Sequence, residues 1–359
     1  METQSNKIDF SGQHIYAGFN VHLKSWNVTI LTEKLNYKTF TQPPSAEVLH
    51  NYLVRHFPGG IYHSAYEAGF CGYWIQNKLK ALGVDSIVCN AADIPTSNKE
   101  KVQKTDKRDS IKIAKALRSG DLKSIYVPSV KTLEDRVLIR TRIMLVKDLS
   151  RYKNRIKSFL YFHVIEVPAP FFKTTSHWSK RFYTWLESVE LSEPSGKQAL
   201  TAIITESKHL RQSILVVTRQ IRELANTEAY QNRRLLLQTI PGIGLLTAMI
   251  ILTELETIDR FQRFDDLCGF IGLVPSTRSS GETERDGNLT PRGHSQLRSA
   301  IIESSWAAAR LDPVLNKSYH EYCKRMENNK AIIRIARKLL SRIRFVLKNN
   351  KPYEYSTIN

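Results

Sequence analysis

The residues best suited to chemistry lie between Gly272 and Arg298, where a polar, glycine-punctuated segment carries the adjacent serines Ser279 and Ser280. Attack on a phosphodiester needs a hydroxyl that can be activated and positive charge that stabilises the phosphorane. The alternative is that Ser280 is an ordinary turn residue, and Ser276 and Ser279 are neighbouring candidates for the same role. Arginines of this segment that would clamp phosphate, or else be surface charges, are Arg278, Arg285, Arg292 and Arg298.

A second set of polar residues lies in the N-terminal third. Asn20 follows the first predicted strand, Glu67 ends the fourth, and Asp106 and Asp109 share one face if their segment is helical. Acidic residues at the strand ends of an α/β sheet can converge on Mg²⁺, which prefers hard oxygen ligands and bridges to substrate phosphates. The alternative for the two aspartates is a pair of helix-start charges on a solvated face.

A third candidate is the turn Ile240-Pro-Gly242-Ile-Gly244, which precedes an apolar segment. It resembles a helix-hairpin-helix element, in which backbone amides at a helix N-terminus approach a phosphate. Gly242 and Gly244 are therefore candidate nucleic-acid-binding residues. The alternative is a tight glycine turn between two core helices.

The charge of the chain favours a polyanionic partner. Its 359 residues, long enough for about two domains, include 53 Lys and Arg against 34 Asp and Glu, a net charge of +19. Neutralised phosphates release condensed counterions, so such an excess favours binding to nucleic acid. The alternative is a merely soluble basic protein, since the hydrophobic fraction of 42% is ordinary.

The cysteine pattern and the lack of long apolar segments predict the cellular compartment of the protein. The four cysteines are scattered, with neither zinc-site spacing nor a disulfide pattern, which favours reduced thiols. The N-terminus has no signal-peptide core, and no apolar run reaches the roughly 18 residues of a membrane span. We expect a cytoplasmic, nucleoid-associated protein with no membrane partner. The cysteines are Cys71, Cys89, Cys268 and Cys323.

Three segments must position these residues. Residues 13–129 alternate predicted strands and helices, which is typical of an α/β domain with a mixed sheet. Residues 130–234 carry long helical patterns on a basic background, interrupted by Pro168 and Pro170, which predicts a helical hairpin or coiled-coil arm, or an ordinary bundle. We expect such an arm to self-associate. Residues 235–350 predict a mainly α domain, with helices over 245–255, 295–310 and 331–348 around a loop that carries Ser280.

These motifs together resemble the IS110 family of insertion-sequence transposases, which is related to the Piv DNA invertase. The resemblance covers nearly the whole chain, in a consistent order. It rests on Tyr16-Ala-Gly-Phe-Asn20, Tyr66-Glu67-Ala-Gly, Lys104-Thr-Asp106-Lys-Arg-Asp109, Ile240-Pro-Gly-Ile-Gly244, Gly272-Leu-Val-Pro, Ser280-Gly-Glu and Leu297-Arg298.

The resemblance implies a RuvC-like, ribonuclease-H-type N-terminal domain whose Asp, Glu, Asp, Asp set binds Mg²⁺. It also implies that Ser280 attacks a phosphodiester to form a covalent protein–DNA intermediate. Recombination would then occur without loss or gain of nucleotides, and a structured non-coding RNA would guide the choice of donor and target DNA. The family further implies dimers that assemble into a tetramer across two DNAs.

One position departs from the family. Asn20 stands where the family has aspartate, and an amide keeps one oxygen ligand but loses the negative charge, so affinity for a metal should fall. Two other functions stay open. One is a metal-only nuclease of the Holliday-junction-resolving kind, in which the C-terminal domain serves only for binding. The other, favoured by Asn20, is a nucleic-acid-binding, catalytically impaired copy.

Overall fold

The computed structural model describes residues 9–95, 105–173, 175–280, 283–289 and 292–355. Contacts divide the chain into two units, Met1–Val127 and Pro128–Asn359, and each unit has its own hydrophobic core. The arm and the C-terminal segment, which the sequence distinguishes, belong to the same unit.

The N-terminal unit contains a five-stranded mixed sheet in the order β3-β2-β1-β4-β5. The strands β1, β2 and β3 form an antiparallel meander, whereas β4 and β5 run parallel to β1. The predicted α/β class with a mixed sheet is confirmed. The strands are β1 (His14–Val21), β2 (Trp26–Thr32), β3 (Asn36–Gln42), β4 (Ile61–Glu67) and β5 (Asp85–Cys89).

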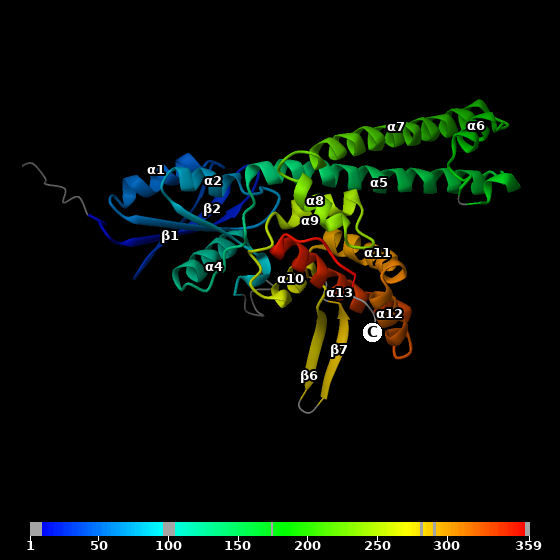
Figure 1. Ribbon diagram of the computed structural model, residues 1–359. Helices are drawn as coiled ribbons and strands as arrows, with labels where there is room; N and C mark the ends of the chain where they lie inside the picture. The colour runs from blue at the N-terminus through cyan, green and yellow to red at the C-terminus, as the bar shows by residue number, and fades with distance from the viewer. Residues whose placement is uncertain (1–8, 96–104, 174, 281–282, 290–291, 356–359) are drawn as a thin grey trace, which may run out of the picture. The chain divides into compact units, whose positions relative to one another are not determined.

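Helices cover both faces of this sheet (Figure 1). Ile15 and Phe19 of β1 share a core with α1 (Ala46–His56) and α2 (Trp74–Ala81) on one face. On the other face lies α4 (Asp106–Arg118), so close that a Cβ on Gly18 would be 2.1 Å from the Ala114 nitrogen. The short helix η1 (Ala91–Asp93) follows β5. Because side chains alternate along a strand, the even-numbered residues of β1 face α4.

Both aspartates lie in the first turn of α4, so their segment is helical as the shared face requires. The helix begins at Asp106, because the Thr105 hydroxyl accepts a hydrogen bond from the Arg108 amide and caps the helix. The buried apolar face of α1 is narrow, since Leu49 and Leu53 are buried but Val48 and Val54 are exposed.

The C-terminal unit begins with a helical hairpin. The long helices α5 (Val130–Phe162) and α7 (Pro194–Ala225) lie side by side in Figure 1, with η2 (Ala169–Phe171) and α6 (Lys180–Ser188) between them in sequence. A separate core at its far end joins Leu160 of α5, Phe182 and Leu186 of α6, and Leu200 of α7. The helical hairpin is present as predicted, while coiled-coil geometry stays a prediction.

The middle of the C-terminal unit is formed by α9 (Leu245–Leu255), in which every residue from Ala248 to Leu255 except Ile250 is buried. The helices α5, α7, α8 and α11 all contact it, so this apolar helix is the centre of the unit. The expected mainly helical character is confirmed. The other elements are α8 (Gln231–Gln238), α10 (Phe264–Ile271), β6 (Pro275–Ser280), β7 (Thr283–Leu289), α11 (Ser295–Leu311), α12 (Pro313–Cys323) and α13 (Asn328–Asn349).

One prediction about the C-terminal unit is wrong. The segment expected to be a loop forms an antiparallel hairpin of β6 and β7, which projects away from the helices of its unit (Figure 1). Ser280 is the last residue of β6 and pairs with Thr283. No helix within the described residues has the length and apolar character needed to cross a bilayer.

Candidate functional site

Asn20 and Glu67 lie at adjoining strand ends in the N-terminal unit. Phe19 and Tyr66 are partners in the parallel β1–β4 register and stack at 5.3 Å in the core. Asn20 and Glu67 come next along their strands, so by alternation both face away from that core. The structure thus places them as the sequence suggested, except that Asn20 lies within β1, not after it.

Asp106 lies directly against Asn20. The Asn20 Nδ2 donates a hydrogen bond of 3.2 Å to Asp106 Oδ1, and His22 Nε2 lies 3.1 Å from the same oxygen. Asp109, one turn further along α4, is 15% exposed and lies 3.6 Å from the Lys112 ammonium. The Asn20 amide therefore stabilises Asp106, and the Lys112 ammonium stabilises Asp109.

The four positions offer the right ligand chemistry for a hard divalent cation, since each supplies a side-chain oxygen. Within the described part of the chain, however, no group of three or more His, Cys, Asp or Glu side chains is arranged to hold a metal ion. To contribute its oxygen, the Asn20 amide would have to turn its nitrogen away from Asp106. Asn20 and Asp106 are brought together, whereas a complete four-residue cage is not formed.

Cys89 lies beside this cluster but is unsuited to nucleophilic chemistry. Burial, and then the negative charge of Glu67, raises the pKa of the Cys89 thiol to about 12. A thiol must ionise to act as a nucleophile. Cys89 is therefore a structural residue of β5.

In the C-terminal unit, Gly242 and Gly244 have different surroundings. Gly242 has a φ of +86°, and a Cβ there would lie 2.4 Å from the Ser304 carbonyl oxygen of α11. Close packing of the turn on α11 therefore accounts for Gly242. Gly244 is exposed, is the N-cap of α9, and has no atom within 4 Å of an added Cβ. Of the two glycines, Gly244 has the open backbone that a phosphate contact requires.

The base of the β6–β7 hairpin is tightly packed. Gly272, with a φ of +82°, ends α10, and a Cβ there would lie 2.4 Å from the Arg292 carbonyl oxygen. Arg298 Nη1 donates a 3.3 Å hydrogen bond to the Gly272 carbonyl, so Arg298 supports the hairpin base. Arg292 is exposed. The side chains of Ser276, Arg278, Ser279, Ser280 and Arg285, and the whole of Gly281, lie outside the part of the chain described.

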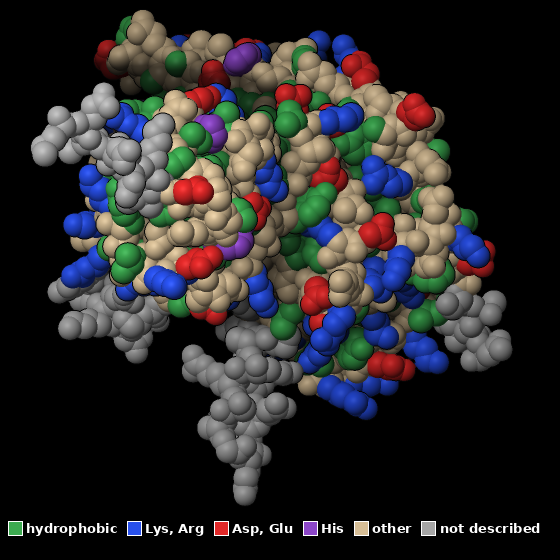
Figure 2. All heavy atoms as spheres, turned by 90° about the vertical axis from the view of Figure 1, so that its left-hand side faces the viewer, with side chains coloured by type: hydrophobic (Ala, Val, Ile, Leu, Met, Phe, Trp, Pro, Cys, Tyr) green, Lys and Arg blue, Asp and Glu red, His purple; other side chains and the backbone are tan. Residues whose placement is uncertain are grey.

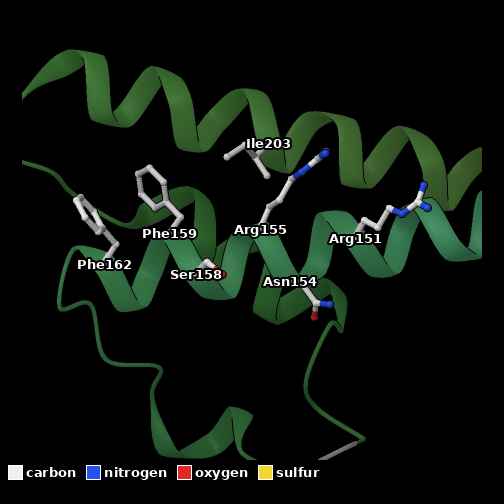
Figure 3. Close-up of a pocket in the computed structure, with 7 residues that line it drawn as sticks. All are labelled: Arg151, Asn154, Arg155, Ser158, Phe159, Phe162 and Ile203. Atoms are coloured by element: carbon white, nitrogen blue, oxygen red, sulfur yellow. The ribbon is translucent and has the colours of Figure 1, made fainter.

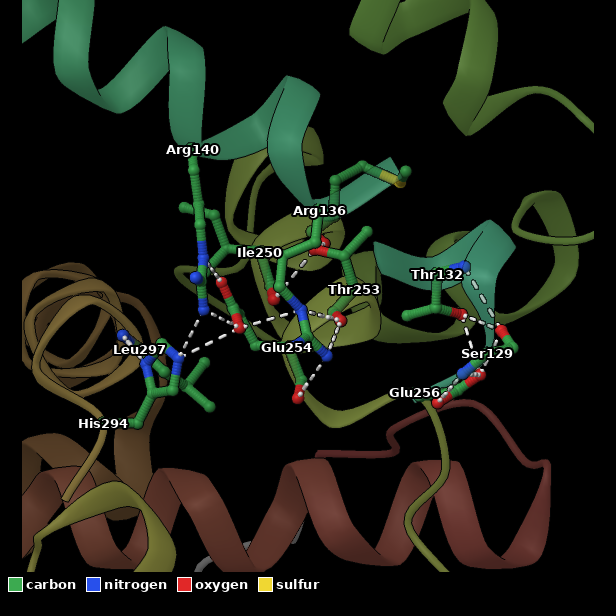
Figure 4. Close-up of polar contacts among 11 residues, drawn as sticks. Ser129, Thr132, Arg136, Arg140, Ile250, Thr253, Glu254, Glu256, His294 and Leu297 are labelled. Atoms are coloured by element: carbon green, nitrogen blue, oxygen red, sulfur yellow. Dashed lines mark hydrogen bonds and ion pairs between the residues drawn. The ribbon is translucent and has the colours of Figure 1, made fainter. Parts of the chain in front are cut away.

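A buried carboxylate that the sequence analysis missed lies near this base (Figure 4). Glu254 is 2% exposed and accepts hydrogen bonds from Arg140 Nε and Nη2, at 2.8 and 2.9 Å. Arg136 Nε lies 3.1 Å and His294 Nε2 2.9 Å from Glu254 Oε2. Burial by itself would raise the pKa of Glu254, but the hydrogen bonds and positive charge of its partners lower it to about 2. A single acid inside an apolar helix was the sequence signal, because a buried charge needs partners.

Glu256, two residues later, has a separate role at the start of the arm (Figure 4). Its Oε1 accepts hydrogen bonds from the Ser129 and Thr132 hydroxyls, at 2.6 and 2.8 Å. Ser129 is the N-cap of α5. Glu256 therefore places a negative charge at the positive end of the α5 dipole, which is favourable.

Lys and Arg side chains are spread over the face shown in Figure 2, with Asp and Glu side chains among them. The positive charge of the described residues on this face is therefore dispersed and is not gathered into one patch.

Comparisons with known proteins identify the family. The model of the transposase IS116/IS110/IS902 family matches residues 234–320, and a transposase model of the DEDD IS110 type matches residues 36–164. The first matched range contains α9, the hairpin, α11 and most of α12, and the second contains Glu67 and both aspartates. The chain belongs to the IS110 family of transposases.

Individual relatives agree with this assignment. The chain is 28% identical to the putative transposase y4qE of Sinorhizobium fredii over 67% of its own length and 57% of the relative. It is 28% identical to the transposase for insertion sequence element IS1533 of Leptospira borgpetersenii, over 69% of this chain and 71% of the relative. It is 30% identical to the pilin gene-inverting protein of Moraxella bovis over 41% of this chain and 47% of the relative. The match therefore spans little more than half the length of the first of these relatives.

Proposed function

We propose that this protein is the recombinase of an insertion sequence, which cuts and rejoins DNA with Ser280 as its nucleophile. The observation that carries the proposal is the position of Ser280 at the outer end of β6, inside the segment that matches the transposase family model. A projecting hairpin presents its end to a DNA backbone, which the buried serines of the unit, Ser207 and Ser305, cannot reach.

The reaction is a transesterification. The Ser280 hydroxyl oxygen forms a bond to phosphorus, a bridging phosphorus–oxygen bond breaks, and the departing sugar oxygen receives the proton that the serine loses. Reversal by the sugar hydroxyl of a second DNA end rejoins the strands and frees the serine. No nucleotide is lost or gained. Arg278, two residues before Ser280 on β6, would stabilise the phosphorane. Arg292, exposed beside the hairpin base and therefore distant from Ser280, would contact a DNA phosphate further along the backbone.

Trapping of the covalent intermediate tests this proposal. Wild type, Ser280→Ala and Ser279→Ala would be incubated with end-labelled DNA and analysed on denaturing gels. We expect an adduct from wild type and Ser279→Ala, and none from Ser280→Ala. An adduct lost only in Ser279→Ala would identify the neighbouring serine. Strand cleavage by all three proteins without an adduct would support the metal-only nuclease.

The carboxylates of the N-terminal unit are the proposed metal-binding residues. Glu67, Asp106 and Asp109, with the Asn20 oxygen, would hold Mg²⁺, which lowers the pKa of a coordinated hydroxyl and neutralises charge on a phosphate. In this chain Asn20 itself holds Asp106 by a hydrogen bond, so it keeps the aspartate in place without a cation.

The hydrogen bond between Asn20 and Asp106 favours a second candidate function, in which the protein binds nucleic acid but catalyses recombination slowly. The amide nitrogen occupies an oxygen of Asp106 that a metal would need. Comparison of Asn20→Asp with wild type separates the candidates. A large gain in adduct formation would show that this copy is impaired, whereas equal rates would show that the amide is tolerated.

A structured guide RNA and a second copy of the chain are the proposed partners besides DNA. The net charge of +19 supports an RNA partner. Sequencing of co-purified RNA is the test. One enriched structured species is expected, and a random sample of cellular RNA would remove the guided part of the proposal.

Self-association is proposed through the arm, as a dimer that assembles further into a tetramer. A surface depression of about 650 Å³ lies near the far end of the arm, and exposed Phe162 and basic Arg151 and Arg155 help to line it (Figure 3). Phe162 is 80% exposed and neighbouring Tyr161 is 89% exposed. Apolar surface of this kind marks interaction sites.

A further inference from the structure

The buried Glu254 connects three parts of the C-terminal unit that are distant in sequence. The carboxylate belongs to α9, its two arginine partners to α5 of the arm, and its histidine partner to the residue that precedes α11 (Figure 4). The guanidinium of Arg140 binds it through two parallel hydrogen bonds, the geometry that fixes direction as well as distance.

The hydrogen bonds of His294 determine which ring nitrogen carries the proton. Nδ1 lies 3.2 Å from the Leu297 backbone nitrogen and must accept its hydrogen, because a backbone amide can only donate. Nε2 then carries the hydrogen and donates it to Glu254 Oε2 at 2.9 Å, while Arg140 Nη2, itself a donor to the same oxygen, lies 3.3 Å from Nε2. His294 thus caps α11 with one nitrogen and reaches Glu254 with the other, which orients its ring completely.

His294 is also the residue at which the chain leaves the hairpin. Its backbone nitrogen donates a 2.9 Å hydrogen bond to the Phe270 carbonyl at the end of α10. The preceding Gly293 has a φ of +113°, and a Cβ there would lie 2.5 Å from the Gly272 Cα. The two ends of the hairpin therefore meet at one tightly packed point, and His294 joins that point to Glu254.

Because the hairpin is long, a small change in the packing of its base moves its outer end by a large distance. From Leu273 to Ser280 the chain extends roughly 20 Å, at about 3.3 Å for each residue of a strand. A tilt of about 5° at the base would move the outer end by roughly 2 Å. An isolated two-stranded hairpin has little rigidity of its own, so its direction depends on its base.

We propose that Glu254 and His294 are positioning residues, which fix the direction of the β6–β7 hairpin and link it through Arg140 to the arm. Neither residue touches the reacting atoms. The consequence for reaction rate rests on the proposed role of Ser280, whereas the effect on the direction of the hairpin does not.

Three variants isolate the contact. Glu254→Gln removes the charge and one of the two acceptor oxygens. His294→Asn keeps a side chain that caps α11 well but is too short to reach Glu254. It is the milder change, and it keeps the proposal testable if Glu254→Gln folds poorly. Asp312→Asn is the matched control, because Asp312 is also buried and paired with an arginine, Arg342, but lies at the start of α12.

The direction of the hairpin is measured first, without DNA. Spin labels at Thr283→Cys on the hairpin and Glu303→Cys on α11 report one distance by pulsed electron–electron double resonance. The half-buried Cys71 and Cys323 are replaced by serine. We expect Glu254→Gln and His294→Asn to broaden the distance distribution or shift it by roughly 2 Å or more. We expect Asp312→Asn to leave it unchanged.

The rate is measured second, on labelled DNA with the unlabelled full chain. We expect the rate of adduct formation at saturating DNA to fall on the order of 10- to 100-fold in Glu254→Gln and His294→Asn. The Kd for DNA should change by less than about twofold, because the basic surface is intact.

The two measurements distinguish the possible failures. Unchanged distances in folded His294→Asn would overturn the positioning role, whatever the rates. The same change in Asp312→Asn as in the two test variants would also overturn it, because general loosening would then explain the data. If wild type forms no adduct while Glu254→Gln and His294→Asn show the expected distance changes, the serine chemistry is overturned and the positioning role is left intact.

Discussion

The side-chain amide of Asn20 donates a 3.2 Å hydrogen bond to the carboxylate of Asp106, across from β1 to the first turn of α4. An aspartate at the same place would bring two negative charges together, which raises the pKa of one of them unless a cation lies between. The amide therefore joins β1 to α4 without repulsion between two carboxylates, and it leaves less negative charge at this position than an aspartate would.

Asn20→Asp should make the N-terminal unit dependent on divalent cations. Without Mg²⁺ we expect a lower melting temperature than in wild type, because two carboxylates repel each other. Added Mg²⁺ should raise the melting temperature more in the variant, since a ligand that binds only the folded state stabilises it in proportion to its affinity. Differential scanning fluorimetry across a Mg²⁺ titration measures this.

The control for that experiment is Asn77→Asp, the same substitution at an exposed position of α2. It should respond to Mg²⁺ as wild type does. An Asn20→Asp protein with no additional response to Mg²⁺ would show that these oxygens do not assemble around a cation.

The two glycines of the α8–α9 turn give opposite predictions for the same substitution. Gly242→Ala should lower the free energy of unfolding by more than about 2 kcal/mol, because its φ is +86° and the new Cβ would meet the backbone of α11. Gly244→Ala should leave stability almost unchanged, since its φ of −88° is ordinary and the space around it is open.

The effect of Gly244→Ala on DNA affinity is the informative measurement. If backbone amides at this turn approach a phosphate, a methyl group there should weaken binding, by about 1 kcal/mol or fivefold in Kd. Fluorescence anisotropy with labelled duplex DNA measures it. An unchanged Kd in a stable Gly244→Ala protein would show that the turn serves packing alone.

Helices and strands were predicted from the sequence mainly where buried apolar residues recur with the period of a helix or a strand. The end of the fourth strand at Glu67, the helix over 245–255 and the helix from Ser295 were predicted, because side-chain alternation and helical periodicity are local. The helices α10 and α12 were not predicted. The β6–β7 hairpin was missed since its polar strands lack an alternating apolar face.

The candidate site was predictable only in part. The sequence grouped Asn20, Glu67, Asp106 and Asp109, but the bond between Asn20 and Asp106 depends on how α4 packs on β1, which no local pattern encodes. Glu254 and His294 are 40 residues apart, so only the folded chain shows that they are partners. The structure also explains Gly242 by a contact with α11 that lies more than 60 residues further along.

Glu254 should make stability depend on pH in the acid range. Its pKa falls from 4.5 to about 2 on folding, so its contribution is fully present above about pH 4.5 and is lost as the pH falls toward 2. Glu254→Gln should be destabilised by about 3 to 5 kcal/mol near pH 7, because it leaves buried arginine charge uncompensated. Chemical denaturation at several pH values measures the difference between the two proteins.

That difference should shrink as the pH approaches 2, since wild type then loses its carboxylate charge as well. A difference that stays constant between pH 6 and pH 2 would show that the charge of Glu254 is not what stabilises this part of the unit.

The exposed aromatic residues near the end of the arm predict the site of self-association. Phe162→Asp places a charge on apolar surface that a second copy would cover, so it should shift the protein from dimer toward monomer and raise the dissociation constant by 10-fold or more. Leu311→Asp is the control, because Leu311 is 62% exposed but lies at the end of α11. Light scattering and sedimentation over a range of protein concentrations give the dissociation constant of the dimer for each variant. Equal effects of the two substitutions would exclude a specific contact through the arm, and no effect of Phe162→Asp on a stable dimer would place the interface elsewhere on the chain.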